Sequence, residues 1–317
     1  MLDVYDIRWE KPVPAAERAL VAGALLSPGL VQDTLNCLFG DCVGPMHPQQ
    51  LTVRYLAMGG AKRVYRVQVD APSSQPLRFV LKQFLPRQLA YLPPGATVAG
   101  VRAGAADLDR RLLERMVWAA RRVDALAPGL CPRFGGFWEW GGEDGQPHRC
   151  MTEAYVEGES LDAWKAALED RFIRREVDFA QYTAARHTLE RQAIAAYVRL
   201  WDVLGRETFT SDPSPWNVLF VPGPGGYQPS LIDLHSIHDG GTPLYVFQTL
   251  EELFGSRDEQ REQVLCPGIL DALGEAEGAR FLRTVGAEIE AHADARLRTG
   301  LSSHAASSRA IARFLAR

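Results

Sequence analysis

The 317-residue sequence lacks the features of a zinc protein and of a protein that binds nucleic acids. It contains only five cysteines: Cys37, Cys42, Cys131, Cys150 and Cys266. Their number is odd and no pair has Cys-x-x-Cys spacing, so the pattern excludes a typical zinc site and favours unpaired cytosolic thiols. The formal net charge is −4, which leaves no excess of basic residues to attract a phosphate backbone. We therefore expect no nucleic-acid partner.

The sequence also lacks long apolar segments. No stretch approaches the roughly 18 uninterrupted apolar residues of a membrane-spanning helix, and no apolar run follows the charged residues near the N-terminus. We therefore expect a cytoplasmic protein with no membrane partner. Hydrophobic residues still make up 46% of the sequence and include seven Trp and thirteen Phe, which is enough to bury a core. The length suits two lobes or domains.

Hydrophobic patterns divide the chain into three parts. Helical spacing over residues 15–40, interrupted at Ser27-Pro28-Gly29, predicts a helical N-terminal extension over 1–50. A β-rich domain over 51–156 follows, in which apolar residues at helical period predict one long helix between 105 and 126. Short runs rich in strand-forming residues predict the strands of this domain, at 51–56, 64–69, 78–84, 134–140 and 149–156.

From residue 157 to 317 the pattern is mostly helical. Helical spacing is clearest over 160–168 and 182–204, and it returns over the last eighty or so residues. Two short runs at 218–220 and 230–234 enclose a Pro- and Gly-rich turn, which predicts a hairpin. A β-rich part followed by a helical part predicts an α+β fold.

The hairpin is flanked by residues suited to phosphoryl transfer. Asp212 and Asn217 lie five positions apart in a proline-rich loop that enters the first strand, and Asp233 ends the second apolar run. Phosphoryl transfer requires bound phosphates, neutralisation of their charge, and a carboxylate that orients and deprotonates the acceptor hydroxyl. Carboxylate and amide oxygens are also the ligands that Mg²⁺ prefers.

This order of residues resembles the catalytic and metal loops of the protein-kinase-like superfamily, especially the aminoglycoside phosphotransferase and choline kinase-like family. The resemblance covers about residues 51 to 260. It implies a two-lobed kinase-like fold that binds ATP and Mg²⁺, with Asp212 as the catalytic base and Asn217 and Asp233 as metal ligands.

Segments before this loop resemble the nucleotide-binding parts of the same family. Gly59 and Gly60 resemble the turn that covers the phosphates, and Lys82 resembles the strand lysine that contacts the α- and β-phosphates. Residues 151–161 resemble the hinge that meets adenine, which assigns Glu153 and Tyr155 to cofactor binding. On the long helix, Glu114 is the expected partner of Lys82, and Asp109 stays an alternative because it lies at the edge of the apolar stripe.

The sequence departs from the family near the expected base. Relatives usually carry His at the position of Thr210, and small residues at the position of Trp216. We expect an ATP- and Mg²⁺-dependent phosphotransferase acting on the hydroxyl of a small molecule. Two alternatives stay open, an enzyme of this fold that modifies a protein and a nucleotide-binding pseudokinase. The acceptor and the oligomeric state are left open.

Overall fold

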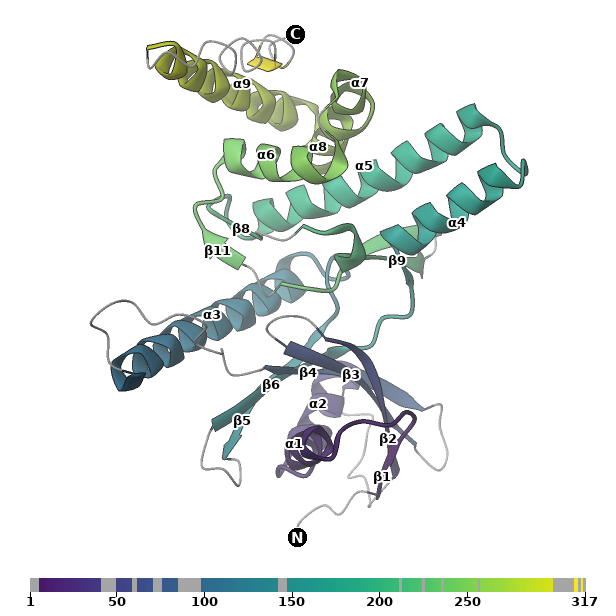
Figure 1. The fold of residues 1–317 in the computed structure, drawn as a ribbon, viewed down its shortest axis with the longest axis vertical. Helices are drawn as coiled ribbons and strands as arrows, with labels where there is room; N and C mark the ends of the chain where they lie inside the picture. Colours follow the sequence, from purple (N-terminus) through teal and green to yellow (C-terminus); the bar gives the residue numbers. More distant parts are fainter. Residues whose placement is uncertain are drawn as a thin grey trace. The chain divides into compact units, whose positions relative to one another are not determined.

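The computed structural model divides the chain into two compact units (Figure 1). Unit 1 comprises Met1–Asp124 and Pro132–Val156, and unit 2 comprises Ala125–Cys131 and Glu157–Arg317. The structure describes residues 6–40, 50–58, 62–70, 76–84, 98–141, 147–210, 213–223, 226–234, 237–255, 257–298, 311–312 and 315. Both units contain helices and strands, so the predicted α+β class is confirmed.

Unit 1 is built on a six-stranded sheet with the order β1-β2-β3-β4-β6-β5. Its strands are β1 (Asp6–Trp9), β2 (Gln50–Met58), β3 (Lys62–Val69), β4 (Leu77–Phe84), β5 (Phe134–Gly141) and β6 (Pro147–Ala154). The short strand β1 pairs in parallel with β2, and the other neighbours are antiparallel. The strand β1 was not predicted from the sequence, because four residues are too few to show a clear alternation.

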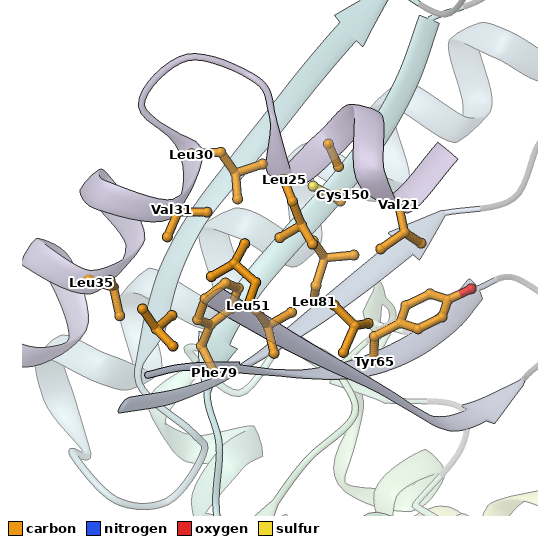
Figure 2. Close-up of a cluster of buried hydrophobic side chains, with 14 of the residues drawn as sticks. Val21, Leu25, Leu30, Val31, Leu35, Leu51, Tyr65, Phe79, Leu81 and Cys150 are labelled. Atoms are coloured by element: carbon orange, nitrogen blue, oxygen red, sulfur yellow. The ribbon is translucent and has the colours of Figure 1, made fainter. Parts of the chain in front are cut away.

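Two helices, α1 (Ala15–Leu25) and α2 (Leu30–Phe39), cover one face of this sheet. Their apolar side chains point toward buried residues of the strands, as Figure 2 shows for Leu25 and Leu35 of the helices and for Phe79 and Leu81 of β4. The hydroxyl groups of Thr34 and Thr152, 3.0 Å apart, add a buried hydrogen bond between α2 and β6. Residues 15–39 therefore form part of the core of unit 1.

The opposite face of the sheet carries the long helix α3 (Val98–Leu126). Leu113 and Met116 of α3 pack on Phe134 and Met151 of the strands. The helix begins seven residues before the predicted start, because its first two turns contain Gly100 and Gly104, and glycine is a poor helix former. Successive side chains of a strand point to opposite faces, so Lys82 on β4 and Glu153 on β6 lie on the α3 side.

Unit 2 is mostly helical. Its helices are α4 (Leu161–Ile173), α5 (Phe179–Val203), α6 (Pro243–Phe254), α7 (Asp258–Gln260), α8 (Cys266–Leu273) and α9 (Glu275–Arg298). The side chain of Ser160 caps the start of α4, and Asp178 with Gln181 forms a capping box at the start of α5. The helix α5 packs against both α4 and α8, with a π-helical stretch Arg261–Leu265 leading into α8.

Short strands complete unit 2. A three-stranded sheet has the order β10-β9-β7, formed by β7 (Glu159–Ser160), β9 (Val218–Gly223) and β10 (Gly226–Leu231). The predicted hairpin is confirmed as β9 and β10, which pair antiparallel. Two further strands, β8 (Thr208–Thr210) and β11 (Ile237–Asp239), pair with each other and were not predicted, since each has only three residues.

Candidate functional site

A buried ion pair joins the neighbouring strands β4 and β6 of unit 1 on the α3 side of the sheet. The Nζ atom of Lys82 lies 2.5 Å from Oε1 of Glu153, and the two side chains are only 4% and 10% exposed. Glu153 stands opposite Val80 in the β4–β6 register, so Lys82 is its diagonal neighbour on the same face. A long side chain reaches such a neighbour easily. The pair therefore holds the ammonium group at a fixed position on a rigid strand.

The carboxylate beside Lys82 is not the one expected from the sequence. Glu114 of α3 is 69% exposed and lies 3.9 Å from Arg110, one helical turn earlier. The expectation that Glu114 contacts Lys82 is corrected, because the apolar stripe of α3 turns Glu114 away from the sheet. Asp109 lies on the same helix, but its side chain is outside the described part of the structure.

Tyr155 follows directly after β6 and is half-buried. The guanidinium group of Arg66 lies over its ring, 5.7 Å from the ring centroid, which orients the ring toward β3. Three residues later, a Cβ atom at Gly158 would lie 2.7 Å from the carbonyl oxygen of Phe220, so the chain passes β9 too closely for any other residue. Gly59 and Gly60, the predicted phosphate-covering turn, lie outside the described residues.

Asn217 is fixed within unit 2 by the backbone around it. It ends the short 3₁₀ helix Pro215–Asn217, its amide donates a hydrogen bond to the Ser214 carbonyl over 2.9 Å, and its side chain is buried. The Tyr197 hydroxyl of α5 donates a hydrogen bond of 3.0 Å to the same carbonyl. This hydrogen bond ties the loop to α5. The contact was not predicted from the sequence, because Tyr197 belongs to an ordinary helical pattern.

A backbone hydrogen bond brings the two predicted metal ligands close together in space. The amide of Ile232 donates to the carbonyl of Asn217 over 2.9 Å, and Asp233 is the residue after Ile232. The strand β10 ends at Leu231, so Asp233 lies just beyond it and is half-buried. The carboxylate and the carboxamide are thus carried by adjoining backbone segments.

The strand β8, which precedes Asp212 in the sequence, pairs with β11, which follows Asp233. Thr210, the last residue of β8, stands opposite Ile237, the first residue of β11, so these two strand ends lie side by side (Figure 1). Asp212, the predicted catalytic base, lies outside the described residues. The described neighbours on each side, Thr210 and Pro213, are both buried.

The chemistry of Asn217 and Asp233 fits a hard divalent cation. Both residues offer oxygen atoms, which Mg²⁺ prefers, and the ion usually takes one or two protein carboxylates and completes its shell with phosphates and water. Within the described ranges, no group of three or more His, Cys, Asp and Glu residues could hold a metal ion by itself.

None of the helices that the structure describes combines the length and the apolar character needed to cross a bilayer.

Comparisons with known proteins identify no family for this chain. No family model and no curated protein matches it. Among solved structures, it is similar to the protein in a structure described as WaaP in complex with acyl carrier protein, with 15% sequence identity and a TM-score of 0.35. The match covers 80% of this chain and 88% of that chain. A TM-score of this size does not establish a shared fold.

Proposed function

We propose that this protein is a phosphotransferase that uses ATP and Mg²⁺ to phosphorylate a hydroxyl group of a small molecule. The observation that carries the proposal is the hydrogen bond from the Ile232 amide to the Asn217 carbonyl, which joins the segments of Asn217 and Asp233. The buried Lys82–Glu153 pair of unit 1 supports it independently, because a phosphotransferase needs a positioned cation for the phosphates.

In this proposal, Asn217 and Asp233 hold the Mg²⁺ ion that arrives with the nucleotide. The ion supplies positive charge next to the transferring phosphate. The Lys82 ammonium contacts the phosphates, and Glu153 keeps the lysine side chain in position. Glu153 thereby acts through Lys82 rather than through the adenine base. Gly59, Gly60 and Tyr155 complete the expected nucleotide contacts.

Asp212 acts as the general base. Its carboxylate accepts a hydrogen bond from the acceptor hydroxyl and takes the proton while the hydroxyl oxygen bonds to the γ-phosphorus. The bond between the γ-phosphorus and the bridging oxygen breaks, and ADP leaves. Asp212 follows the short strand β8, whose pairing with β11 fixes the start of this segment.

The test is a transfer assay with ATP labelled on the γ-phosphate. The full-length protein is incubated with Mg²⁺, labelled ATP and a panel of hydroxylated metabolites, with proteins as separate acceptors. We expect label on at least one small molecule, and the transfer should stop when EDTA removes Mg²⁺.

Parallel reactions with ATP labelled on the α-phosphate separate the alternatives. Label on a protein from either form of ATP would indicate an enzyme that modifies proteins. ATP binding without transfer to any acceptor would indicate a pseudokinase. Either result would overturn the proposed function.

A further inference from the structure

The N-terminal strand β1 brings a carboxylate to the α3 side of the sheet in unit 1. Trp9 packs against the core on the side covered by α1 and α2, so the next residue, Glu10, points to the opposite face. The amide of Glu10 donates a hydrogen bond of 3.0 Å to the carbonyl of Val53, which extends the parallel pairing of β1 with β2 by one residue. The backbone of the sheet therefore fixes the position of Glu10.

Two arginines contact this carboxylate. Arg54 of β2 and Arg66 of β3 stand directly opposite each other in the antiparallel register, a position in which two like charges repel each other. Oε2 of Glu10 lies 3.7 Å from Nε of Arg54, and Oε1 of Glu10 lies 2.5 Å from Nη2 of Arg66. Glu10 thus supplies the negative charge that allows the two arginines to stand side by side.

The contact with Glu10 orients the side chain of Arg66. This side chain is only 14% exposed, and within the described part of the chain its buried Nε atom has no hydrogen-bond partner. The same guanidinium group lies over the ring of Tyr155, and a cation in this position is attracted by the face of the ring. Glu10, Arg66 and Tyr155 thus form a continuous series of contacts that begins next to β1 and ends directly after β6.

The series ends on the face of the sheet that carries the proposed nucleotide contacts. Arg66 stands opposite Val80 in the β3–β4 register, and Val80 stands opposite Glu153 in the β4–β6 register. Arg66 therefore lies on the same face as the buried pair of Lys82 and Glu153. Its contact with Tyr155 places the tyrosine ring on this face as well.

We propose that Glu10 is a positioning residue of the nucleotide site, because it holds Arg66 in place and Arg66 in turn holds the ring of Tyr155 where the nucleotide binds. This inference rests on the proposed function, which takes Tyr155 as a nucleotide contact. The strands β1 and β6 are separated by β2, β3 and β4 in the sheet. The N-terminal strand therefore acts on nucleotide binding without touching the nucleotide.

The first experiment follows the tyrosine ring by NMR and needs no nucleotide. The full-length protein is prepared with ¹³C-labelled tyrosine rings, and the signal of Tyr155 is assigned by its loss in Tyr155→Phe. We expect Glu10→Gln and Arg66→Gln each to shift this signal, since the guanidinium group leaves the face of the ring. Asp6→Asn is the matched control, because it makes the same carboxylate-to-amide change on β1, where Asp6 contacts Gln50 and Arg8. It should leave the Tyr155 signal unchanged.

The second experiment measures the binding of ATP with Mg²⁺ by calorimetry. Glu10→Gln should weaken this binding about threefold to fivefold, the scale of one cation–π contact at a partly exposed position, and Asp6→Asn should not change it. Arg66→Gln should also weaken binding, and its combination with Glu10→Gln should bind no more weakly than Arg66→Gln alone, because both residues act through one contact. A purely electrostatic effect has the opposite sign at Glu10, since removal of a negative charge favours an anionic nucleotide.

Three outcomes would overturn the proposal. A Tyr155 signal that stays in place in Glu10→Gln would mean that Glu10 does not position the ring. A shifted signal with unchanged or tighter ATP binding would show that the ring position does not matter for the nucleotide. A parent protein that binds no ATP would overturn the proposed function and with it the role of Glu10 in that site, although the NMR comparison would still show whether Glu10 holds the ring.

Discussion

The buried pair of Lys82 and Glu153 gives the sharpest prediction about stability. Glu153→Gln removes the carboxylate beside an ammonium group that is 4% exposed, and Lys82→Met removes the ammonium group beside a carboxylate that is 10% exposed. Removal of one partner of a buried ion pair costs about 3–5 kcal/mol in the free energy of unfolding. Each single substitution should therefore destabilise the protein by about this amount.

The double variant separates pairing from simple loss of side chains. Lys82→Met combined with Glu153→Gln contains neither charge, so it should be less destabilised than either single variant. The two effects should then differ from additivity by about 3 kcal/mol or more. Such a result would show that the two charges are tolerated in unit 1 only when both are present.

Urea unfolding followed by circular dichroism measures these free energies. Glu114→Gln is the matched control, because it makes the same chemical change in a pair that is more than half exposed and 3.9 Å long. Exposed pairs contribute about 0–1 kcal/mol, so this variant should be almost as stable as the parent. The reasoning fails if Glu153→Gln costs no more than Glu114→Gln, or if the effects of the two buried substitutions simply add.

Three other predictions follow from the same structure. Asp233→Asn should weaken Mg²⁺-dependent ATP binding measured by calorimetry, since one anionic oxygen ligand is lost, and an unchanged affinity would remove Asp233 from the metal site. Burial and a hydrogen bond to the Glu17 carboxylate raise the pKa of Tyr65 above its ordinary value of 10.0. The unfolded chain then releases this proton first, so the free energy of unfolding should fall as the pH rises above about 10, by about 1.4 kcal/mol at pH 11. In urea titrations over the same pH range, the free energy of unfolding of Tyr65→Phe should fall by about 1.4 kcal/mol less than that of the parent. Parallel curves for the two proteins would contradict the raised pKa of Tyr65. Iodoacetamide followed by peptide mass spectrometry should label the exposed Cys37 faster than Cys150 and Cys266, because burial raises the pKa of Cys150 and raises that of Cys266 to about 12. Equal labelling rates would show that these two thiols are accessible.

The sequence was informative where a pattern repeats within one element. The strands β3 and β4 follow from apolar runs separated by turn residues, and their bounds lie within two residues of the predicted ones. The hairpin of β9 and β10 was also predicted, but its second strand, expected at 230–234, lies at Gly226–Leu231. The strands β1, β8 and β11 were not predicted. Each has only three or four residues and exists because of a partner strand that is distant in the sequence, which a local pattern does not encode.

The same distinction applies to the candidate site. The closeness of the Asn217 and Asp233 segments follows from the hairpin, since these residues flank its two ends. The partner of Lys82 depends instead on β4 pairing with β6, which brings residues from distant parts of the chain onto one face. The available signal was a pair of opposite charges, Lys82 and Glu153, each next to apolar residues of its own strand, which is typical of a shared buried pair.

Turnover by Asp212→Asn tests the central claim most directly. The variant and the parent are compared in steady-state transfer from ATP to the best acceptor of the panel, and ATP affinity is measured separately by calorimetry. If Asp212 takes the proton of the acceptor hydroxyl, kcat should fall by about 100-fold or more while the affinity for ATP stays nearly the same. Turnover within about threefold of that of the parent would contradict the proposed role of Asp212 and with it the mechanism.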